Sequence, residues 1–288
     1  MDLILIKTLN GLTTGVLYAM TAFGLTFILG MLNIPNFAHG ALFALGAYVG
    51  FSVLGATGSF WAALVVAPLI VALFGAALER GLIQRLYGDD PDNENYTLLV
   101  LFAVAIIMQE VIILIWGATG QSAMPPQALL GAAQLGPIYF PKYRLFILGF
   151  TLLVIGACWL FIERTRYGAL IKAAIDKREM VMLLGYDIRV LFVVSFALGA
   201  GLAGLAGALS LPIRGVQPFI GMDILALSFV IVVVGGLGNL YGAIFAGILI
   251  GLIQEFATLV HPLAPWIFVY GAMMLVLLVR PTGLFGTR

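Results

Sequence analysis

The sequence predicts an all-α membrane protein, a polytopic transmembrane helical bundle with about eight or nine membrane segments. Apolar residues make up 62% of the chain and charged residues only 9%, whereas a soluble domain carries about 25% charged residues. Long stretches contain no charge at all. Because these stretches do not alternate apolar and polar residues as barrel strands do, helices must satisfy their backbone polar groups inside the bilayer.

The first uncharged stretch lies between Lys7 and Glu79. A helix needs only about 20 residues to cross the hydrocarbon core, so this stretch should cross about three times. The turn-forming residues at Asn33–Asn36 and Gly55–Ser59 predict where the helices end. These breaks divide the stretch into segments at residues 9–30, 39–55 and 60–79.

A second uncharged stretch runs between Asp223 and Glu255. At about 1.5 Å per residue it is too long for a single crossing of a core of about 30 Å. We expect a break at Gly235–Asn239, where three of five residues are glycine. The remaining predicted segments cover residues 97–116, 144–162, 190–211, 223–238, 241–258 and 265–279.

Lysine and arginine predict the orientation, because cytoplasmic loops carry an excess of both. Nine crossings with the N-terminus outside and the C-terminus cytoplasmic place ten of these residues inside and four outside. The inner group is Arg80, Arg85, Arg164, Arg166, Lys172, Lys177, Arg178, Arg189, Arg280 and Arg288, and the outer group is Lys7, Lys142, Arg144 and Arg214. We expect one transmembrane domain over residues 1–288, with its largest cytoplasmic loop at about 163–189.

Two similar stretches suggest an internal repeat with broken helices. Asn36–Ala44 and Asn239–Ala246 each place Asn and Gly at a break and then begin a new apolar segment. Transporters are often built from repeated halves in this way. Under the predicted topology the repeat is parallel, and one re-entrant segment would make it inverted. A third stretch, Gly199–Ala208, places small residues four apart, which favours close packing between helices.

The cytoplasmic loop at 163–189 contains a predicted short helix. We expect Gly168 to end the preceding span and a helix to run from Ala169 to Leu184, closed by Gly185. Such a helix needs a surface to lie on, either the lipid interface or a groove on a cytoplasmic partner, and its composition favours neither. Its charged face would hold Lys172, Asp176 and Glu179, with Ile171, Ala174, Ile175 and Met182 elsewhere.

Several motifs together resemble permease subunits of branched-chain amino acid ABC importers. They are Gly24–Asn33, Asn36–Gly40, Thr165–Gly168, Lys172–Ala174, Asp176, Arg178–Glu179, Leu184–Gly185, Val234–Gly242 and Arg280–Gly286. The resemblance covers nearly the whole chain. It implies a bacterial inner (plasma) membrane complex of two related permeases, two ATP-binding subunits and an external substrate-binding protein.

The resemblance also implies how such a complex works. ATP hydrolysis on the partner subunits would drive alternating access, with ATP and magnesium bound there and no cofactor bound by this chain. The loop helix would be the coupling helix that rests on the ATPase. Its residues would be Thr165, Arg166, Gly168, Lys172, Asp176, Arg178, Glu179 and Gly185, with Lys172 standing where the family's pattern leads us to expect arginine.

The sequence lacks the motifs of an enzyme. None of the four lysines follows a glycine, so no phosphate-binding loop of the Gly-x-x-x-x-Gly-Lys type is present. No His, Cys and Asp cluster has metal-ligand spacing, and no nucleophile and base pattern is visible. A net charge of +1 gives no indication of nucleic acid. The lipid bilayer is the partner that the composition itself requires.

Polar residues at the breaks or inside the apolar segments are candidates for the translocation path. They are Asn36, His39, Gly40, Asn239, Glu110 and Glu255. Acids inside a membrane are costly and often functional, but the two glutamates could instead snorkel to the interface or pair structurally with Arg144 or Arg214. His39 could equally be a helix-start residue bonded to nearby backbone.

The substrate is less well defined by the sequence than the fold. Branched-chain or other small amino acids are the first expectation, and urea, amides or small organic acids are alternatives that the same family implies. A stand-alone secondary transporter, driven by an ion gradient without partners, is the alternative from another class.

Overall fold

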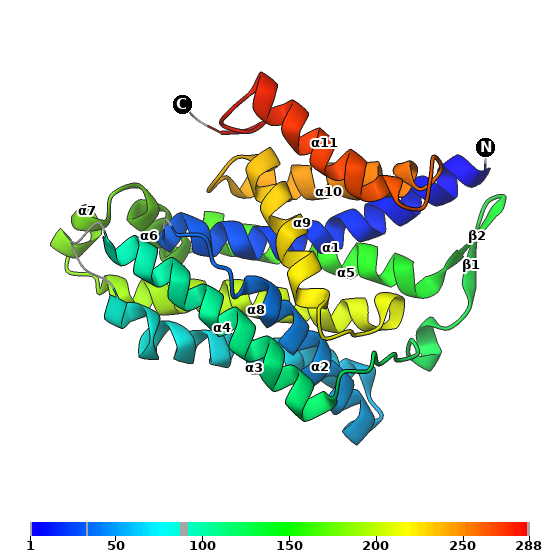
Figure 1. The fold of residues 1–288 in the computed structure, drawn as a ribbon, viewed down its shortest axis with the longest axis horizontal. Coiled ribbons are helices and arrows are strands. Elements are labelled where there is room, and N and C mark those ends of the chain that lie inside the picture. The colour runs from blue at the N-terminus through cyan, green and yellow to red at the C-terminus, as the bar shows by residue number, and fades with distance from the viewer. Residues whose placement is uncertain (1, 33, 87–91, 287–288) are drawn as a thin grey trace. The chain divides into compact units, whose positions relative to one another are not determined.

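A computed structural model describes residues 2–32, 34–86 and 92–286, and it is mostly helical (Figure 1). Each of the nine predicted membrane segments corresponds to a helix. The helices are α1 (Asp2–Leu32), α2 (His39–Thr57), α3 (Phe60–Gly81), α4 (Asp92–Trp116), α5 (Lys142–Arg164), α8 (Ile188–Arg214), α9 (Ile220–Gly235), α10 (Leu240–Ala257) and α11 (Ala264–Val279). The predicted all-α polytopic bundle is therefore confirmed.

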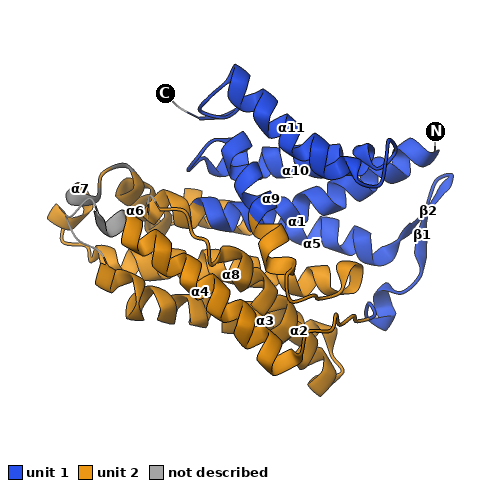
Figure 2. Ribbon diagram, viewed as in Figure 1, with its two compact units in different colours: residues 1–26, 124–154, 226–288 blue, residues 27–123, 155–225 orange. Residues whose placement is uncertain are grey.

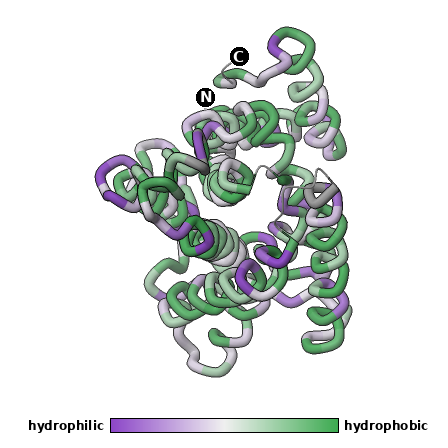
Figure 3. The backbone as a smooth tube through the Cα atoms, turned by 90° about the vertical axis from the view of Figure 1, so that its left-hand side faces the viewer, coloured by the Kyte–Doolittle hydropathy of each residue, from purple (hydrophilic) through white to green (hydrophobic). Residues whose placement is uncertain are grey.

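Length separates these helices into two groups. Seven are long and apolar enough to cross a membrane, whereas α9 and α11 have 16 residues each. Sixteen residues span about 24 Å at 1.5 Å per residue, less than the hydrocarbon thickness of about 30 Å. Apolar residues dominate the helical segments in Figure 3. The number of full crossings and the N-out orientation stay predictions.

Shorter elements join the long helices. They are the 3-10 helices η1 (Ile83–Leu86) and η2 (Gln127–Leu129), the strands β1 (Ala132–Leu135) and β2 (Ile138–Pro141), and the helices α6 (Arg166–Asp176) and α7 (Arg178–Leu183). The strands form an antiparallel hairpin that pairs Ala132 with Pro141 and Leu135 with Ile138. Gly136 at its turn has φ 62°, a left-handed conformation that favours glycine.

Figure 2 divides the chain into two compact units. Unit 1 comprises residues 1–26, 124–154 and 226–288, and unit 2 comprises residues 27–123 and 155–225. The helices α1, α5 and α9 contribute residues to both. The two units are groups of residues that pack closely with one another. Such grouping does not test the prediction of a single transmembrane domain, which stays a prediction.

Unit 2 is built on close packing among α2, α3 and α8. Gly46 of α2 lies against the backbone of Gly204 of α8, and a side chain at either Gly46 or Gly207 would overlap backbone atoms of the facing helix. On its other side, a Cβ at Gly204 would lie 2.7 Å from Cβ of Val71 in α3. The predicted role of the small residues in Gly199–Ala208 as close helix contacts is therefore confirmed.

Unit 1 contains a similar crossing between α1 and α10. A Cβ at Gly15 would lie 2.8 Å from Cα of Ile248, and one at Gly11 would lie 3.0 Å from Cα of Leu252. Gly251 in turn lies against the backbone of Gly15. Glycine on both helices lets the two backbones approach, which increases the dispersion contact that holds helices together in lipid.

The predicted breaks between helices are confirmed. Gly58 ends α2 with φ 65°, and the Ser59 side chain accepts a hydrogen bond from Ala62 N at 3.3 Å as the N-cap of α3. Between α9 and α10, Gly236 and Gly238 have φ of 105° and 78°. Such left-handed conformations explain why glycine occupies these positions.

Candidate functional site

The break between α1 and α2 is mostly buried where it is described, and the asparagine at its centre bonds the nearby backbone. Oδ1 of Asn36 accepts a hydrogen bond from Ala38 N at 3.0 Å, and His39 N donates to Asn36 O at 3.2 Å. Both Asn36 and His39 are 0% exposed. Asn36 therefore satisfies backbone groups that the break frees, as expected for irregular backbone within a membrane. Asn33, the first residue of the predicted break, lies outside the described residues.

Immediately after this break, α2 touches the first turn of α9. A Cβ at Gly40 would overlap Gly221 O, and a Cβ at Gly221 would lie 2.7 Å from Gly40 O. Glycine at both positions thus allows direct backbone contact between the two helices. The predicted path residue Gly40 is a packing residue that fixes how closely α2 and α9 approach.

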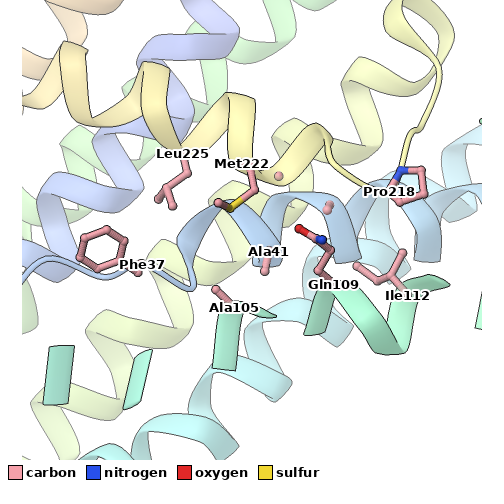
Figure 4. Close-up of a pocket in the computed structure, with 10 residues that line it drawn as sticks. Phe37, Ala41, Ala105, Gln109, Ile112, Pro218, Met222 and Leu225 are labelled. Atoms are coloured by element: carbon pink, nitrogen blue, oxygen red, sulfur yellow. The ribbon is translucent and has the colours of Figure 1, made fainter. Parts of the chain in front are cut away.

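A pocket lies beside this crossing, among α2, α4, α9 and the segment before α9 (Figure 4). It is small and partly open to the surroundings, with room for about one water molecule. The lining residues are Phe37, Ala41, Ala44, Ala105, Gln109, Ile112, Pro218, Gly221, Met222 and Leu225. The pocket is thus aliphatic and aromatic, with one side-chain amide among its lining residues.

Gln109 supplies that amide, and it is not among the residues that the sequence predicts for the path. In Figure 4 its side chain points away from α4 into the space between α4 and the labelled residues of α2 and α9. The neighbouring Glu110, which we predicted for the path, is exposed. Successive helical residues differ by about 100° in direction, so one faces the pocket and the other does not. In the sequence, the position of Gln109 directly before Glu110 in an apolar segment was the feature that could have indicated it.

The acid at the end of α10 has a different partner from the one expected. Glu255 Oε1 lies 3.1 Å from Lys7 Nζ, and it also accepts from Asn10 Nδ2 at 3.3 Å. The expectation of pairing with Arg144 or Arg214 is wrong: Arg144 instead donates a hydrogen bond to Oδ1 of Asn10. The Lys7 and Glu255 side chains are about one-fifth exposed, so the pair joins α1 to α10 in a partly buried setting.

Asn239 bridges two segments at the second break. Its Oδ1 accepts from Gly242 N at 2.9 Å, which caps α10, and its Nδ2 donates to Phe285 O at 2.8 Å. The amide therefore satisfies the helix start as predicted. It also binds the C-terminal tail, which the sequence did not indicate.

The tail itself, Arg280–Gly286, completes the end of α9. Leu284 N donates to Val234 O at 2.8 Å, and Phe285 N donates to Gly235 O at 3.1 Å. The last carbonyls of a helix have no partner within the helix, so the tail supplies two of the missing donors. Two motifs that resemble the permease family, one at the break and one at the C-terminus, thus form one structural unit.

The cytoplasmic loop begins differently from the prediction. Thr165, and not Gly168, separates α5 from the loop helix: its Oγ1 accepts from Gly168 N at 3.1 Å as the N-cap of α6. Gly168 lies in the first turn of α6, where a Cβ would overlap Ile162 O. The expectation that Gly168 breaks the span is therefore wrong, because the glycine provides close packing at the corner.

The loop also contains two helices where we expected one. Lys177, with φ −148° and ψ 90°, is extended and separates α6 from α7. The predicted charged face from Lys172 to Glu179 therefore does not lie on one continuous helix. Gly185, with φ 84°, follows the end of α7 as predicted.

Charged residues of the loop are described in part. Lys172 Nζ lies 2.9 Å from Glu163 Oε2, in a pair that is exposed enough to contribute little to stability, and Arg166 is exposed. The side chains of Asp176, Arg178 and Glu179 lie outside the described residues. The coupling role of all these residues stays a prediction.

Apolar residues of the loop divide into an inner and an outer set. Ile171, Ala174 and Val181 are at most 1% exposed, whereas the outer set, Met180, Leu183 and Leu184, is 60%, 86% and 71% exposed. On its inner side α6 also contacts the end of α1, since a Cβ at Gly30 would lie 3.3 Å from Cδ1 of Ile175. The inner set thus anchors the loop within unit 2, and the described residues leave the outer set uncovered.

Comparison with known proteins identifies related chains over nearly the full length. The BraD permease protein of the high-affinity branched-chain amino acid transport system of Pseudomonas aeruginosa is 28% identical, covering 97% of this chain and 95% of BraD. LivH of Escherichia coli K12, named in the same way, is 28% identical over 96% and 94% of the two chains. LivM of that organism is 25% identical over 96% and 69%.

A solved structure has the same fold. PsaBC from Streptococcus pneumoniae in complex with Fab aligns with 96% of this chain and 92% of its own, with a TM-score of 0.51 and 12% identity. The family model described as branched-chain amino acid transport system, permease component, matches residues 7–278. The chain belongs to the permease family of branched-chain amino acid transport systems.

Proposed function

We propose that this chain is one membrane-spanning subunit of a bacterial ABC importer and forms part of the translocation path for branched-chain or other small amino acids. The observation that carries the proposal is the family match over residues 7–278, joined to a helix break at the buried residues Asn36 and His39. ATP hydrolysis on two partner subunits would drive alternating access, with magnesium and ATP bound there. An external binding protein would deliver the substrate at the inner membrane of the cell.

The α6–α7 segment is the proposed docking surface for an ATP-binding subunit. Met180, Leu183 and Leu184 are large, apolar and more than half exposed, and exposed apolar groups on a loop between spans favour a protein contact. Because ten of the fourteen basic residues lie on this side in the predicted topology, the surface would face the cytosol. This argument favours a protein groove over the lipid interface.

The same segment offers a mechanical route to the buried break. Ile175 of α6 packs against α1 at Gly30, and the break at Asn36 follows a few residues later. A displacement of α6 by the ATPase would therefore move the end of α1. Since interiors are close-packed, such a displacement is passed on to neighbouring groups rather than absorbed.

A second, related permease completes the proposed complex. LivH and LivM of one organism are both permease proteins of a high-affinity branched-chain amino acid transport system, and this chain is similar to both. The higher identity and fuller coverage with LivH support the proposal that this chain takes the LivH place. Whether the neighbouring subunit is identical or a paralogue is then a question of which permease co-purifies.

Reconstitution tests the proposed function. Proteoliposomes containing the permease pair, the ATP-binding subunits and the binding protein should take up leucine only with ATP inside. Uptake by the purified chain alone, driven by an ion gradient, would instead support a secondary transporter. Urea or an amide as the preferred cargo would keep the import mechanism and change the substrate.

A pull-down tests the docking surface. Leu183→Glu, or charge reversal at Asp176 and Glu179 together, should release the ATP-binding subunit while the permease stays folded. Tyr139→Glu is the matched control, because Tyr139 is 69% exposed in the hairpin and lies on the opposite side in the predicted topology. Equal recovery of the ATPase with the Leu183 variant and the control would exclude this surface.

A further inference from the structure

The longest connection on the outer side of the predicted topology joins α4 to α5. It runs from Gly117 to Pro141, whereas the next longest on that side among the described residues, between α10 and α11, runs only from Thr258 to Leu263. The longer connection contains the antiparallel hairpin of β1 and β2. Figure 1 shows the two strands at a steep angle to α5, beside the start of that helix. The hairpin is therefore the main outer structure that is not part of a membrane helix.

The two faces of the hairpin differ in burial. Ile138 and Phe140 point to one face and are 3% and 1% exposed. Tyr139 points to the opposite face, as alternate residues of a strand do, and is 69% exposed. Its cross-strand partner Gln134 is exposed as well. One face thus anchors the hairpin on the rest of the chain, and the other presents a tyrosine ring.

The start of α5 is fastened to α1 directly after the hairpin. Arg144 donates a hydrogen bond to Oδ1 of Asn10, and Asn10 Nδ2 donates to Glu255 Oε1 at 3.3 Å. Tyr143, between the hairpin and this contact, is buried. These contacts fix the hairpin before any partner arrives. A preorganised surface loses little conformational entropy on binding.

Charge indicates the kind of partner that this surface fits. Between Glu110 and Glu163 the charged residues are Lys142 and Arg144, both basic. Lys142 follows β2 directly, is exposed, and has no ionic partner among the described residues. An exposed lysine without a nearby acid favours a partner with an acidic surface. Tyrosine is among the residues that contribute most to the affinity of protein interfaces, so the hairpin combines an anchor residue with a charge that selects the partner.

We propose that the external substrate-binding protein docks on the exposed face of this hairpin, with Tyr139 as the central contact and Lys142 beside acidic residues of the binding protein. The inference rests on the proposed function and on the predicted orientation with the N-terminus outside. It assigns the outer partner to one segment of the chain, as α6–α7 is assigned to the inner partner. Lipid is the competing occupant, because tyrosine is also enriched at the membrane interface.

The first test measures the affinity of the external leucine-binding protein for the whole complex in nanodiscs. Tyr139→Ala should raise Kd about 30-fold, the loss at which a residue counts as central to an interface. Lys142→Glu should raise Kd at low salt and much less at high salt, because salt screens exposed charges.

Two matched controls accompany these variants. Tyr186→Ala removes an exposed tyrosine from the cytoplasmic loop and should leave Kd unchanged. Arg214→Glu makes the same charge reversal at another exposed outer position and should change Kd far less than Lys142→Glu. All four variants should retain the ATP-binding subunit in a pull-down, which excludes a folding defect.

Chemical labelling tests whether protein or lipid covers the surface. Tyr139→Cys, in a background where the free Cys158 is replaced by serine, should react with a membrane-impermeant maleimide outside sealed right-side-out vesicles. The binding protein should slow this reaction. Tyr186→Cys should react only after the vesicles are opened. A hairpin covered by lipid would react slowly with and without the binding protein, and that result would overturn the inference.

The outcomes separate the inference from the proposed function. Wild-type Kd for both Tyr139→Ala and Lys142→Glu, in a complex that imports leucine with ATP, would overturn the docking surface and leave the importer standing. Equal losses for Lys142→Glu and Arg214→Glu, with no effect of Tyr139→Ala, would show that net charge alone acts and would also overturn it. Absence of both binding and ATP-dependent uptake in the unaltered complex would overturn the proposed function itself.

Discussion

Asn239 offers a sharp test of the argument that one amide links the second break to the C-terminal tail. Asn239→Ala removes the acceptor for Gly242 N and the donor to Phe285 O. Loss of an N-cap costs about 1 kcal/mol, and loss of a hydrogen bond costs about 0.5–1.5 kcal/mol. The bond to Phe285 is exposed, so we expect about 1.5 kcal/mol in total, with the tail and the first turn of α10 opening about ten times more often.

Asn239→Asp is the matched variant, because it keeps the acceptor for Gly242 N and loses only the donor to Phe285 O. Hydrogen exchange on the protein in nanodiscs measures both effects. The amides of Leu284 and Phe285 should exchange faster in both variants, whereas that of Gly242 should exchange faster in the alanine variant alone. Wild-type exchange at Leu284 and Phe285 in both variants would show that the amide does not hold the tail, and would refute the reasoning.

Three further substitutions test other contacts. Gly251→Ala should lower the melting temperature, because its Cβ would meet the α1 backbone and overpacking costs about 1–3 kcal/mol. Gly156→Ala is the control: nothing lies within 4 Å of its Cβ among the described residues, so this change should raise the melting temperature slightly. Equal shifts for the two variants would contradict the tight crossing of α1 and α10. Glu255→Gln should destabilise the protein more at low salt than at high salt, because it removes the partly exposed pair with Lys7; an effect independent of salt would contradict an ionic contribution. Thr165→Val should lower the stability of α6 by about 1 kcal/mol, because the N-cap is lost, and proteolysis of the loop should become faster. Thr165→Ser should restore the N-cap and the wild-type rate of proteolysis.

The membrane segments could be predicted because their lengths follow from the solvent. A charge-free stretch must fit the hydrocarbon thickness, and Asn and Gly at a break satisfy or relax the backbone there. The helix ends at Gly58 and Gly235 accordingly lie within three residues of the predicted ones. Segment lengths and helix ends depend on residues that are neighbours in the sequence, so they can be predicted from the sequence alone.

Contacts between distant residues could not be predicted in this way. The Lys7–Glu255 pair joins residues 248 apart in the chain, and the sequence suggested Arg144 or Arg214 as the partner instead. The extended Lys177 was missed for a related reason: the charge spacing on the loop was derived from an assumed continuous helix, and no glycine or proline marks the break. Gln109 was missed because its direction relative to α2 depends on how α4 is rotated in the packed unit.

The two asparagines of the predicted repeat show how far similar sequence implies similar function. Asn36 Oδ1 bonds the backbone N–H two residues ahead, and Asn239 Oδ1 bonds the one three residues ahead, so both serve the break on which they lie. Asn239 is bonded at both ends of its amide. Asn36 is fully buried, and its Nδ2 has no hydrogen-bond partner among the described residues.

A buried donor without a partner costs about 1–3 kcal/mol. Because a passing substrate could supply the missing acceptor, Asn36 is a better candidate than Asn239 for a residue that contacts the substrate. Asn36→Asp keeps the acceptor and removes the donor, as the same change does at Asn239. We expect it to reduce leucine uptake at saturating ATP far more than Asn239→Asp does, with both complexes assembled to the same extent. Equal effects would show that Asn36 and Asn239 have the same role in transport. The two stretches would then repeat a function, and not only the way in which an asparagine bonds the backbone at a break.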